Sequence, residues 1–161
     1  MGRGKTGKIS NTPEKARAYV LRLLKFRPRT ISEINDKLRE KGYKKETIEN
    51  LIRDFRKKKY LDDKMFARLW VSGRMSFKPE GCFLLGKELE KKGVCADIIK
   101  EVLADSAGKD GEYELARVAA LKRKKVLGRI DKTKSKKRIY DHLLRRGFDF
   151  ETAYKVIEEI Y

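Results

Sequence analysis

The chain has 161 residues, and its 42 Lys and Arg against 24 Asp and Glu give a formal net charge of +18. One His and two Cys are too few for a disulfide framework or for a metal site with three or four ligands. No apolar run is long enough to span a membrane, and the basic start lacks the hydrophobic segment of a secretory signal. We therefore expect a cytoplasmic protein, without cofactor or metal, that has a polyanionic partner.

The first elements are marked by helix-start signals. Residues 1–13 are basic and contain Gly and Ser, so we expect a flexible arm. Thr12, followed by Pro and Glu, predicts the N-cap of a helix that runs to about Lys25. Thr30, with Glu33 three residues later, matches the capping box of a second helix.

A phrase of sixteen residues then occurs three times, beginning at Lys37 (KLREKGYKKETIENLI), at Glu88 (ELEKKGVCADIIKEVL) and at His142 (HLLRRGFDFETAYKVI). In each copy a Leu lies four residues before a central Gly, and the apolar residues on both sides follow helical spacing. A glycine past a helix end favours a Schellman ending, in which the next residue packs back onto that leucine. Each phrase therefore predicts a helix, a glycine-closed turn and a second helix. The key residues are Leu38 and Gly42, Leu89 and Gly93, and Leu143 and Gly147.

Other boundaries between helices are also marked. Asp62 and Asp63 precede an apolar stretch and predict a helix start. Lys78 and Pro79 are expected to break one helix and to begin the next. Asp149 predicts the N-cap of the final helix.

The threefold repeat extends upstream of the phrases. An Ala-Arg pair precedes each phrase, at Ala16, Ala67 and Ala116. The third pair lies five residues further from its glycine, and LGRIDKTKSKK predicts a loop that takes up the difference. No segment alternates with period two, so we predict an all-α protein of nine helices, arranged as three tandem three-helix bundles in an elongated row. The predicted bundles are residues 14–60, 61–109 and 110–161, the last with a basic linker at 126–138.

Few residues could carry catalysis. His142 is the one histidine, and it takes the phrase position held by Lys37 and Glu88, which indicates a solvent-facing site. No G-x-x-x-x-G-K-[ST] motif for nucleotide phosphates is present. We predict that the chain is not an enzyme, while a helical enzyme with an unrecognised site remains an alternative.

The basic residues cluster at the ends of expected helices, where cations are favoured by the helix dipole. This does not explain ten cations between Lys122 and Arg138 with Asp131 as the one acid. Neutralisation of phosphates does explain them, and acids on the expected third helices, such as Glu46, predict contact with a nucleic-acid backbone rather than base readout. The candidate residues for binding DNA or a DNA-bound protein are Arg56, Lys57, Lys58, Lys59, Lys122, Arg123, Lys124, Lys125, Arg129, Lys132, Lys134, Lys136, Lys137, Arg138, Arg145 and Arg146.

Several segments resemble the RecX family of regulatory proteins. They are RPRTISEINDKLREKG from Arg27, YLDDKMFA from Tyr60, the second phrase with its leading glycine from Gly81, and LLRRGF from Leu143. The resemblance covers nearly the whole chain from about Glu14 and implies tandem three-helix repeats. The arm before Glu14 and the basic residues 126–138 depart from the family pattern, which leaves open how the affinity divides between DNA and protein.

The resemblance also implies a function. RecX proteins lie in the groove of the RecA filament on single-stranded DNA and inhibit its ATP hydrolysis, strand exchange and coprotease activity. This chain would then be a non-enzymatic regulator of recombination, DNA repair and the SOS response, with the RecA filament and single-stranded DNA as partners and duplex DNA as a further candidate. No heptad seam is present, so we expect a monomer. Besides the helical enzyme, the residues leave a second alternative open, a helical-repeat nucleic-acid-binding module that acts without RecA.

Overall fold

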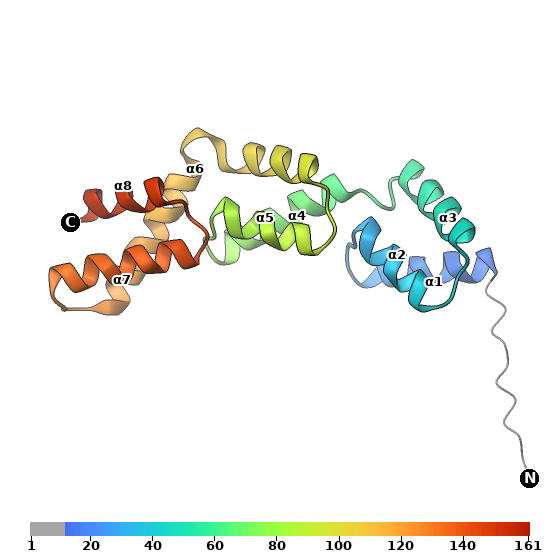
Figure 1. The fold of residues 1–161 in the computed structure, drawn as a ribbon, viewed down its shortest axis with the longest axis horizontal. Helices are drawn as coiled ribbons and strands as arrows, with labels where there is room; N and C mark the ends of the chain where they lie inside the picture. Colours follow the sequence, from blue (N-terminus) through green and yellow to red (C-terminus); the bar gives the residue numbers. More distant parts are fainter. Residues whose placement is uncertain (1–11) are drawn as a thin grey trace, which may run out of the picture. The chain divides into compact units, whose positions relative to one another are not determined.

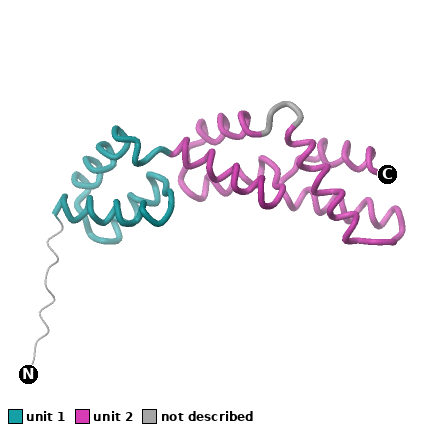
Figure 2. Tube along the Cα trace, turned by 180° about the vertical axis from the view of Figure 1, so that it is seen from behind, with its two compact units in different colours: residues 1–62 teal, residues 63–161 magenta. Residues whose placement is uncertain are grey.

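The computed structural model describes residues 12–161, apart from the side chains of residues 107–110. Within this range every regular element is a helix, as the sequence predicts. The chain divides into two compact units, residues 1–62 and residues 63–161 (Figure 2). Most of the predicted basic arm, up to residue 11, lies outside the described residues.

Unit 1 is a bundle of three helices, which we call repeat 1 (Figure 1): α1 (Pro13–Phe26), α2 (Ile31–Glu40) and α3 (Lys45–Lys57). Thr12 caps α1 by accepting a hydrogen bond from the Lys15 amide at 3.4 Å. Thr30 caps α2 in the same way, from the Glu33 amide at 3.1 Å. Both predicted N-caps are therefore confirmed, and each satisfies an amide at a helix start that has no partner within the helix.

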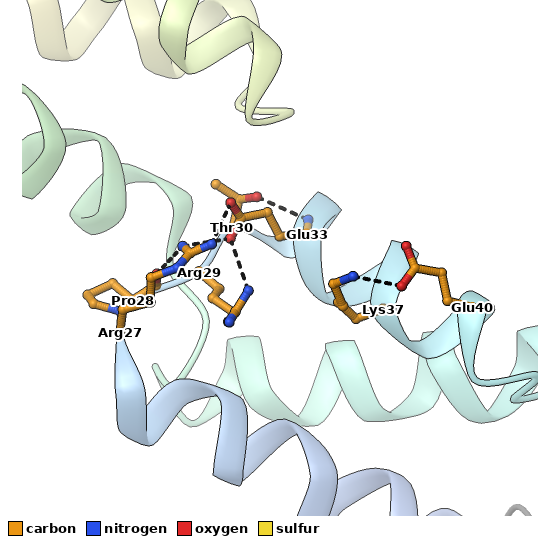
Figure 3. A network of polar contacts seen from close by, with 7 residues as sticks. All are labelled: Arg27, Pro28, Arg29, Thr30, Glu33, Lys37 and Glu40. Carbon is orange, nitrogen blue, oxygen red and sulfur yellow. Dashed lines mark hydrogen bonds and ion pairs between the residues drawn. The ribbon is translucent and has the colours of Figure 1, made fainter.

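The connection between α1 and α2 is held by a network of charged side chains (Figure 3). The Arg27 guanidinium donates to both carboxylate oxygens of Glu33, at 3.0 and 3.2 Å, and Arg29 lies 3.9 Å from the same carboxylate. Further along α2, Lys37 donates to Glu40 at 2.7 Å. The two arginines that flank the proline therefore fix the chain as it enters α2, because they converge on one carboxylate in its first turn.

Unit 2 contains five helices: α4 (Asp63–Phe77), α5 (Cys82–Lys91), α6 (Ala96–Leu127), α7 (Lys132–Arg145) and α8 (Phe150–Ile160). The first part of α6 packs in a core with α4 and α5, which together form repeat 2, and Val102 of α6 is fully buried there. The second part packs with α7 and α8 as repeat 3, through buried Ala116 and Ala120. Across residues 12–161 eight helices thus fill the nine predicted helical positions, because α6 serves two repeats.

The three phrase glycines have the left-handed backbone that the sequence predicts, with φ of 76° at Gly42, 77° at Gly93 and 82° at Gly147. After each glycine, the next amide donates to the carbonyl of the leucine five residues earlier. These hydrogen bonds join Tyr43 to Leu38 at 3.1 Å, Val94 to Leu89 at 3.1 Å and Phe148 to Leu143 at 3.2 Å. They form the Schellman ending, and all three leucines are 0% exposed.

Repeats 2 and 3 are joined by a close backbone crossing within unit 2. The Gly81 amide donates to the Arg146 carbonyl at 2.8 Å, and the Arg146 guanidinium donates to the Pro79 carbonyl at 3.3 Å. A Cβ atom on Gly81 would lie 2.2 Å from the carbonyl oxygen of Gly147. Glycine is required at this crossing because any side chain would force the two backbones apart.

The start of α5 differs from the prediction. Pro79 follows the end of α4 at Phe77, as expected, but α5 begins three residues later, at Cys82. Gly81 occupies the N-cap position and has no side chain to cap the helix. The Glu112 carboxylate of α6 instead accepts the Cys82 amide at 2.9 Å. The capping residue lies thirty positions away in the sequence, so the local sequence around Cys82 could not predict this cap.

The predicted basic linker at 126–138 is wrong. The helix α6 continues to Leu127 and α7 begins at Lys132, which leaves a connection of four residues. Asp131 is the N-cap of α7 and accepts the Lys134 amide at 3.0 Å. All four lysines within residues 126–138 lie on α7, where they follow the N-cap and share the helix with a buried face. The buried residues of that face are Ser135, Ile139 and Leu143.

Candidate nucleic-acid interface

The structure divides the sixteen predicted binding residues into two classes, according to whether the side chain has a partner within the chain. Nine are exposed and, within the part of the chain that the structure describes, have no hydrogen-bond, ion-pair or aromatic partner. They are Arg56, Lys57, Lys122, Lys125, Arg129, Lys134, Lys137, Arg138 and Arg145. Seven of the nine belong to repeat 3, so the positive charge available to an external partner is concentrated on α6, α7 and the turn between them.

Three of the other candidates are paired with carboxylates. Because these pairs lie at the surface, where solvent screens the charges, each contributes little to stability. A phosphate would have to displace the carboxylate before it could bind. The pairs are Lys58 with Asp54 at 3.0 Å, Lys59 with Asp62 at 3.6 Å and Lys136 with Glu158 at 3.1 Å.

Two more candidates hold the end of α8. The Lys124 ammonium lies 3.9 Å from the ring centroid of Tyr161 and donates to the Ile160 carbonyl at 2.5 Å. The Lys132 ammonium donates to the Tyr161 carbonyl at 2.8 Å, and the Ser135 hydroxyl is hydrogen-bonded to the Tyr161 hydroxyl. These lysines tie three helices of repeat 3 together, and their role is therefore partly structural.

The last two candidates, Arg123 and Arg146, lie near His142. The Nε atom of Arg123 is buried and has no acceptor among the described residues. The Arg146 side chain is 21% exposed and lies 4.0 Å from the Glu80 carboxylate. His142 is partly buried rather than solvent-facing as predicted. Burial lowers the pKa of His142, and the charges of Arg146, Arg123, Arg145 and Lys78 lower it further.

One repeated feature was missed in the sequence. The arginine of each Ala-Arg pair on the first helix binds an acid that lies twelve residues after the phrase glycine, on the third helix. The Arg17 hydrogen bond lowers the pKa of Asp54, and the Tyr113 and Arg117 hydrogen bonds lower that of Glu159. The regular spacing of the acids was a signal that could have revealed this tie. The pairs are Arg17 with Asp54 at 2.5 Å, Arg68 with Asp105 at 3.1 Å and Arg117 with Glu159 at 2.6 Å.

Comparison with protein-family models assigns each repeat in turn. Residues 16–54 match the first three-helix domain of RecX, residues 62–103 the second and residues 110–157 the third. The chain belongs to the RecX family.

Named relatives agree with this assignment. Regulatory protein RecX of Prosthecochloris aestuarii is 35% identical over 140 residues, covering 85% of this chain and 87% of the relative. Regulatory protein RecX of Amycolatopsis mediterranei is 34% identical over 149 residues, covering 91% and 83%. The crystal structure of RecX from Lactobacillus salivarius superimposes with a TM-score of 0.84 at 22% identity, covering 91% of this chain and 95% of that one. Family members carry the name of regulatory proteins, and this chain is a regulator rather than an enzyme.

In this RecX family member, neither the pocket beside α1 nor the cysteine at the start of α5 forms a catalytic site among the described residues. An open pocket of about 480 Å³ lies between α1 and α3, and its ion pair is the Arg17–Asp54 tie. Burial, followed by the charge of Glu112, raises the pKa of the Cys82 thiol to about 12, so this cysteine is not a thiolate nucleophile. Within the described residues, no three His, Cys, Asp or Glu side chains gather as metal ligands, and no helix has the length and apolar character to cross a bilayer.

Proposed function

We propose that this chain regulates the RecA recombinase by binding the filament that RecA forms on single-stranded DNA. It acts in the cytoplasm, lies in the filament groove and suppresses ATP hydrolysis, strand exchange and coprotease activity in recombination and the SOS response. Membership of the RecX family supports this function. The residues that we assign to binding are the exposed cations of repeat 3 that have no partner among the described residues.

Two rows of these cations are candidates for contact with phosphates. On α7, Lys134, Lys137 and Arg138 are spaced by one helical turn and share an exposed face. On α6 and the following turn, the row is Lys122, Lys125 and Arg129. Each cation that neutralises a phosphate of a single strand contributes about −0.7 to the slope of log affinity against log salt, so inhibition weakens steeply as salt rises.

An ATPase assay tests this proposal. RecA on single-stranded DNA is titrated with the wild-type chain and with a triple variant carrying Lys134→Gln, Lys137→Gln and Arg138→Gln. We expect the triple variant to need roughly tenfold more protein for half-inhibition, which corresponds to about 1.4 kcal/mol of lost binding.

The matched control removes the same charge elsewhere. Lys25, Lys91 and Lys100 are exposed lysines outside both rows, and their replacement by Gln makes an equal charge change. This control variant should inhibit within about twofold of wild type. Equal inhibition by all three proteins would remove the α7 row from the mechanism, and a wild-type chain that leaves RecA activity unchanged would reject the function itself.

A nucleic-acid-binding module that acts without RecA is the second candidate, because unpartnered cations neutralise the phosphates of any strand. A pull-down with RecA, in the presence and absence of single-stranded DNA, separates the two. Retention that requires RecA supports the regulator, and retention by DNA alone supports the module. Sedimentation of the free chain tests the expected monomer.

A further inference from the structure

Repeats 2 and 3 place different residues at one pair of equivalent positions. Arg74 lies six residues after Arg68, the arginine of the Ala-Arg pair in repeat 2, and Arg123 lies six residues after Arg117 in repeat 3. Five residues before the phrase glycine, repeat 2 has Glu88 and repeat 3 has His142. The arginine is therefore present in both repeats, whereas the carboxylate is present in one.

In repeat 2 the Glu88 carboxylate binds this arginine through two of its guanidinium nitrogens. The Nε atom of Arg74 donates to Glu88 at 3.0 Å, and its Nη2 atom donates to the other oxygen at 2.6 Å. The Trp70 indole donates to the same carboxylate at 2.8 Å. A planar guanidinium thus binds a planar oxyanion through two parallel hydrogen bonds, which is the strongest polar arrangement available to arginine.

In repeat 3 the corresponding donor has no acceptor. The Nε atom of Arg123 is buried and has no partner among the described side chains and backbone atoms. A buried donor left unpaired is unfavourable, because it has lost its hydrogen bonds to water without replacing them. His142 stands where repeat 2 has its carboxylate and does not replace it, because an imidazole cannot supply two acceptor oxygens.

The surroundings of Arg123 favour an external anion. The charges of Lys78, Arg145 and Arg146 act on His142 together with that of Arg123. Lys78 directly follows α4, Arg123 lies on α6, and Arg145 and Arg146 lie at the end of α7. The Gly81–Arg146 hydrogen bond joins the connection after α4 to the end of α7. The Glu80 carboxylate lies 4.0 Å from the Arg146 guanidinium, and its Oε2 atom is buried without a hydrogen-bond partner among the described residues.

We propose that Arg123 and His142 form a phosphate-binding site, in which a phosphate group takes the place that the Glu88 carboxylate occupies in repeat 2. Two phosphate oxygens accept from the Arg123 guanidinium, a third faces His142, and Lys78 adds charge from the rim. The proposal deepens the proposed function, because a strand phosphate of DNA bound here would fix the register of repeat 3 on the filament. The site recognises phosphate and carries no information about base sequence.

His142 gives a direct readout because it is the one histidine of the chain. Its ring proton signals are followed by NMR from about pH 5 to about pH 8, in chloride, in inorganic phosphate and with a short single-stranded oligonucleotide, all at one ionic strength. A bound phosphate stabilises the protonated imidazole, so the pKa of His142 should rise by about one unit relative to chloride.

The ligands separate the sources of the phosphate. If inorganic phosphate and the oligonucleotide both raise the pKa of His142, a phosphate group alone is sufficient for binding. If only the oligonucleotide raises this pKa, the ligand is a phosphate within a strand. The same pKa in all three solutions overturns the proposal. Arg123→Gln should abolish the rise, and Lys100→Gln, which removes one exposed charge from the same unit, should retain it.

A second variant restores the pattern of repeat 2. His142→Glu gives Arg123 an internal carboxylate, so the chain should unfold at a higher urea concentration than wild type and should lose any dependence of that midpoint on phosphate. A variant that keeps the phosphate dependence contradicts the site. The proposed function is tested independently of this site. It is rejected if the wild-type chain leaves the RecA ATPase activity unchanged, whether or not the pKa of His142 responds to phosphate.

Discussion

Repeats 2 and 3 are built on the same core and differ in how their cations are used. Leu85 and Leu89 of repeat 2 match Ile139 and Leu143 of repeat 3, and all four are 0% exposed. In repeat 2 the basic side chains are mostly paired within the bundle, as in Lys64 with Glu101 at 2.5 Å, Arg68 with Asp105 at 3.1 Å and Arg74 with Glu88 at 2.6 Å. Repeat 3 instead carries seven candidate cations that have no partner among the residues the structure describes.

This difference separates the residues that determine the fold from those proposed to determine binding. The buried positions and the turn glycines are shared, so both repeats fold into the same three-helix arrangement. The exposed positions differ because repeat 3 has few acids: residues 112–146 hold thirteen basic side chains against four acidic ones. Repeat 2 therefore pairs most of its basic side chains internally, and repeat 3 leaves exposed cations, which the proposed function would use to bind a partner.

The largest expected effect comes from removing a shared position. Gly147→Ala places a Cβ atom 2.5 Å from the Leu84 Cβ atom, on a backbone with φ of 82°. We expect a loss of about 3 kcal/mol in the free energy of unfolding, because steric overlap adds to the cost of the left-handed conformation. Urea denaturation, followed by circular dichroism, measures the free energy of unfolding of the variant and of wild type.

Gly73→Ala is the matched control. A Cβ atom there has no neighbour within 4 Å, and Gly73 lies inside α4. Alanine should stabilise the helix by roughly 0.5 to 1 kcal/mol. If both variants moved the unfolding midpoint equally and in the same direction, the requirement for glycine at the crossing between repeats 2 and 3 would be refuted.

A smaller effect is expected at Lys59, where a structural role and a proposed binding role coincide. Lys59 has a φ of 60°, and the amide of Tyr60 donates to the Phe55 carbonyl at 2.9 Å. This is the same helix ending as in the phrases, made without glycine. Lys59→Gly should raise the free energy of unfolding by about 0.5 to 1 kcal/mol, measured by urea titration, because glycine adopts this conformation without steric cost. A destabilised variant would contradict the assignment of strain to this residue.

The smallest effect concerns the ties between first and third helices. Their hydrogen bonds lower the pKa of Asp54 and of Glu159 in the folded state. A lowered folded pKa contributes stability that is present above the unfolded pKa and is lost as pH falls through the folded pKa. The urea midpoint should therefore decline as the pH falls below about 4. Asp54→Asn should reduce that decline, and an unchanged pH profile would show that this tie does not contribute.

Sequence patterns predicted the parts of the fold that depend on neighbouring residues. The caps at Thr12, Thr30 and Asp149 and the glycine turns follow local rules, and all were confirmed. The start of α7 was missed because lysines around the Asp131 cap suggested a linker. The Lys59 turn was missed because a lysine gives no signal for a left-handed backbone.

The candidate interface was harder to predict because a side chain's partners depend on tertiary structure. Composition indicated where the cations are concentrated, and it could not distinguish Lys137, which has no partner in the described chain, from Lys136, which pairs with Glu158. Nor could it show that Arg123 is an orphaned donor. The proposed phosphate site depends on two further facts: His142 aligns with Glu88, and Glu88 binds Arg74.

The salt dependence of single-strand binding tests most directly whether the unpartnered cations of repeat 3 neutralise phosphates. Affinity for a fluorescent oligonucleotide is measured by anisotropy over a range of salt concentrations for wild type, for the Lys134, Lys137 and Arg138 triple Gln variant, and for the Lys25, Lys91 and Lys100 control. The account predicts that the slope of log affinity against log salt becomes shallower by about 2 in the first variant, from about 0.7 for each lost contact, and that the control keeps the wild-type slope. Equal slopes in all three proteins would contradict it.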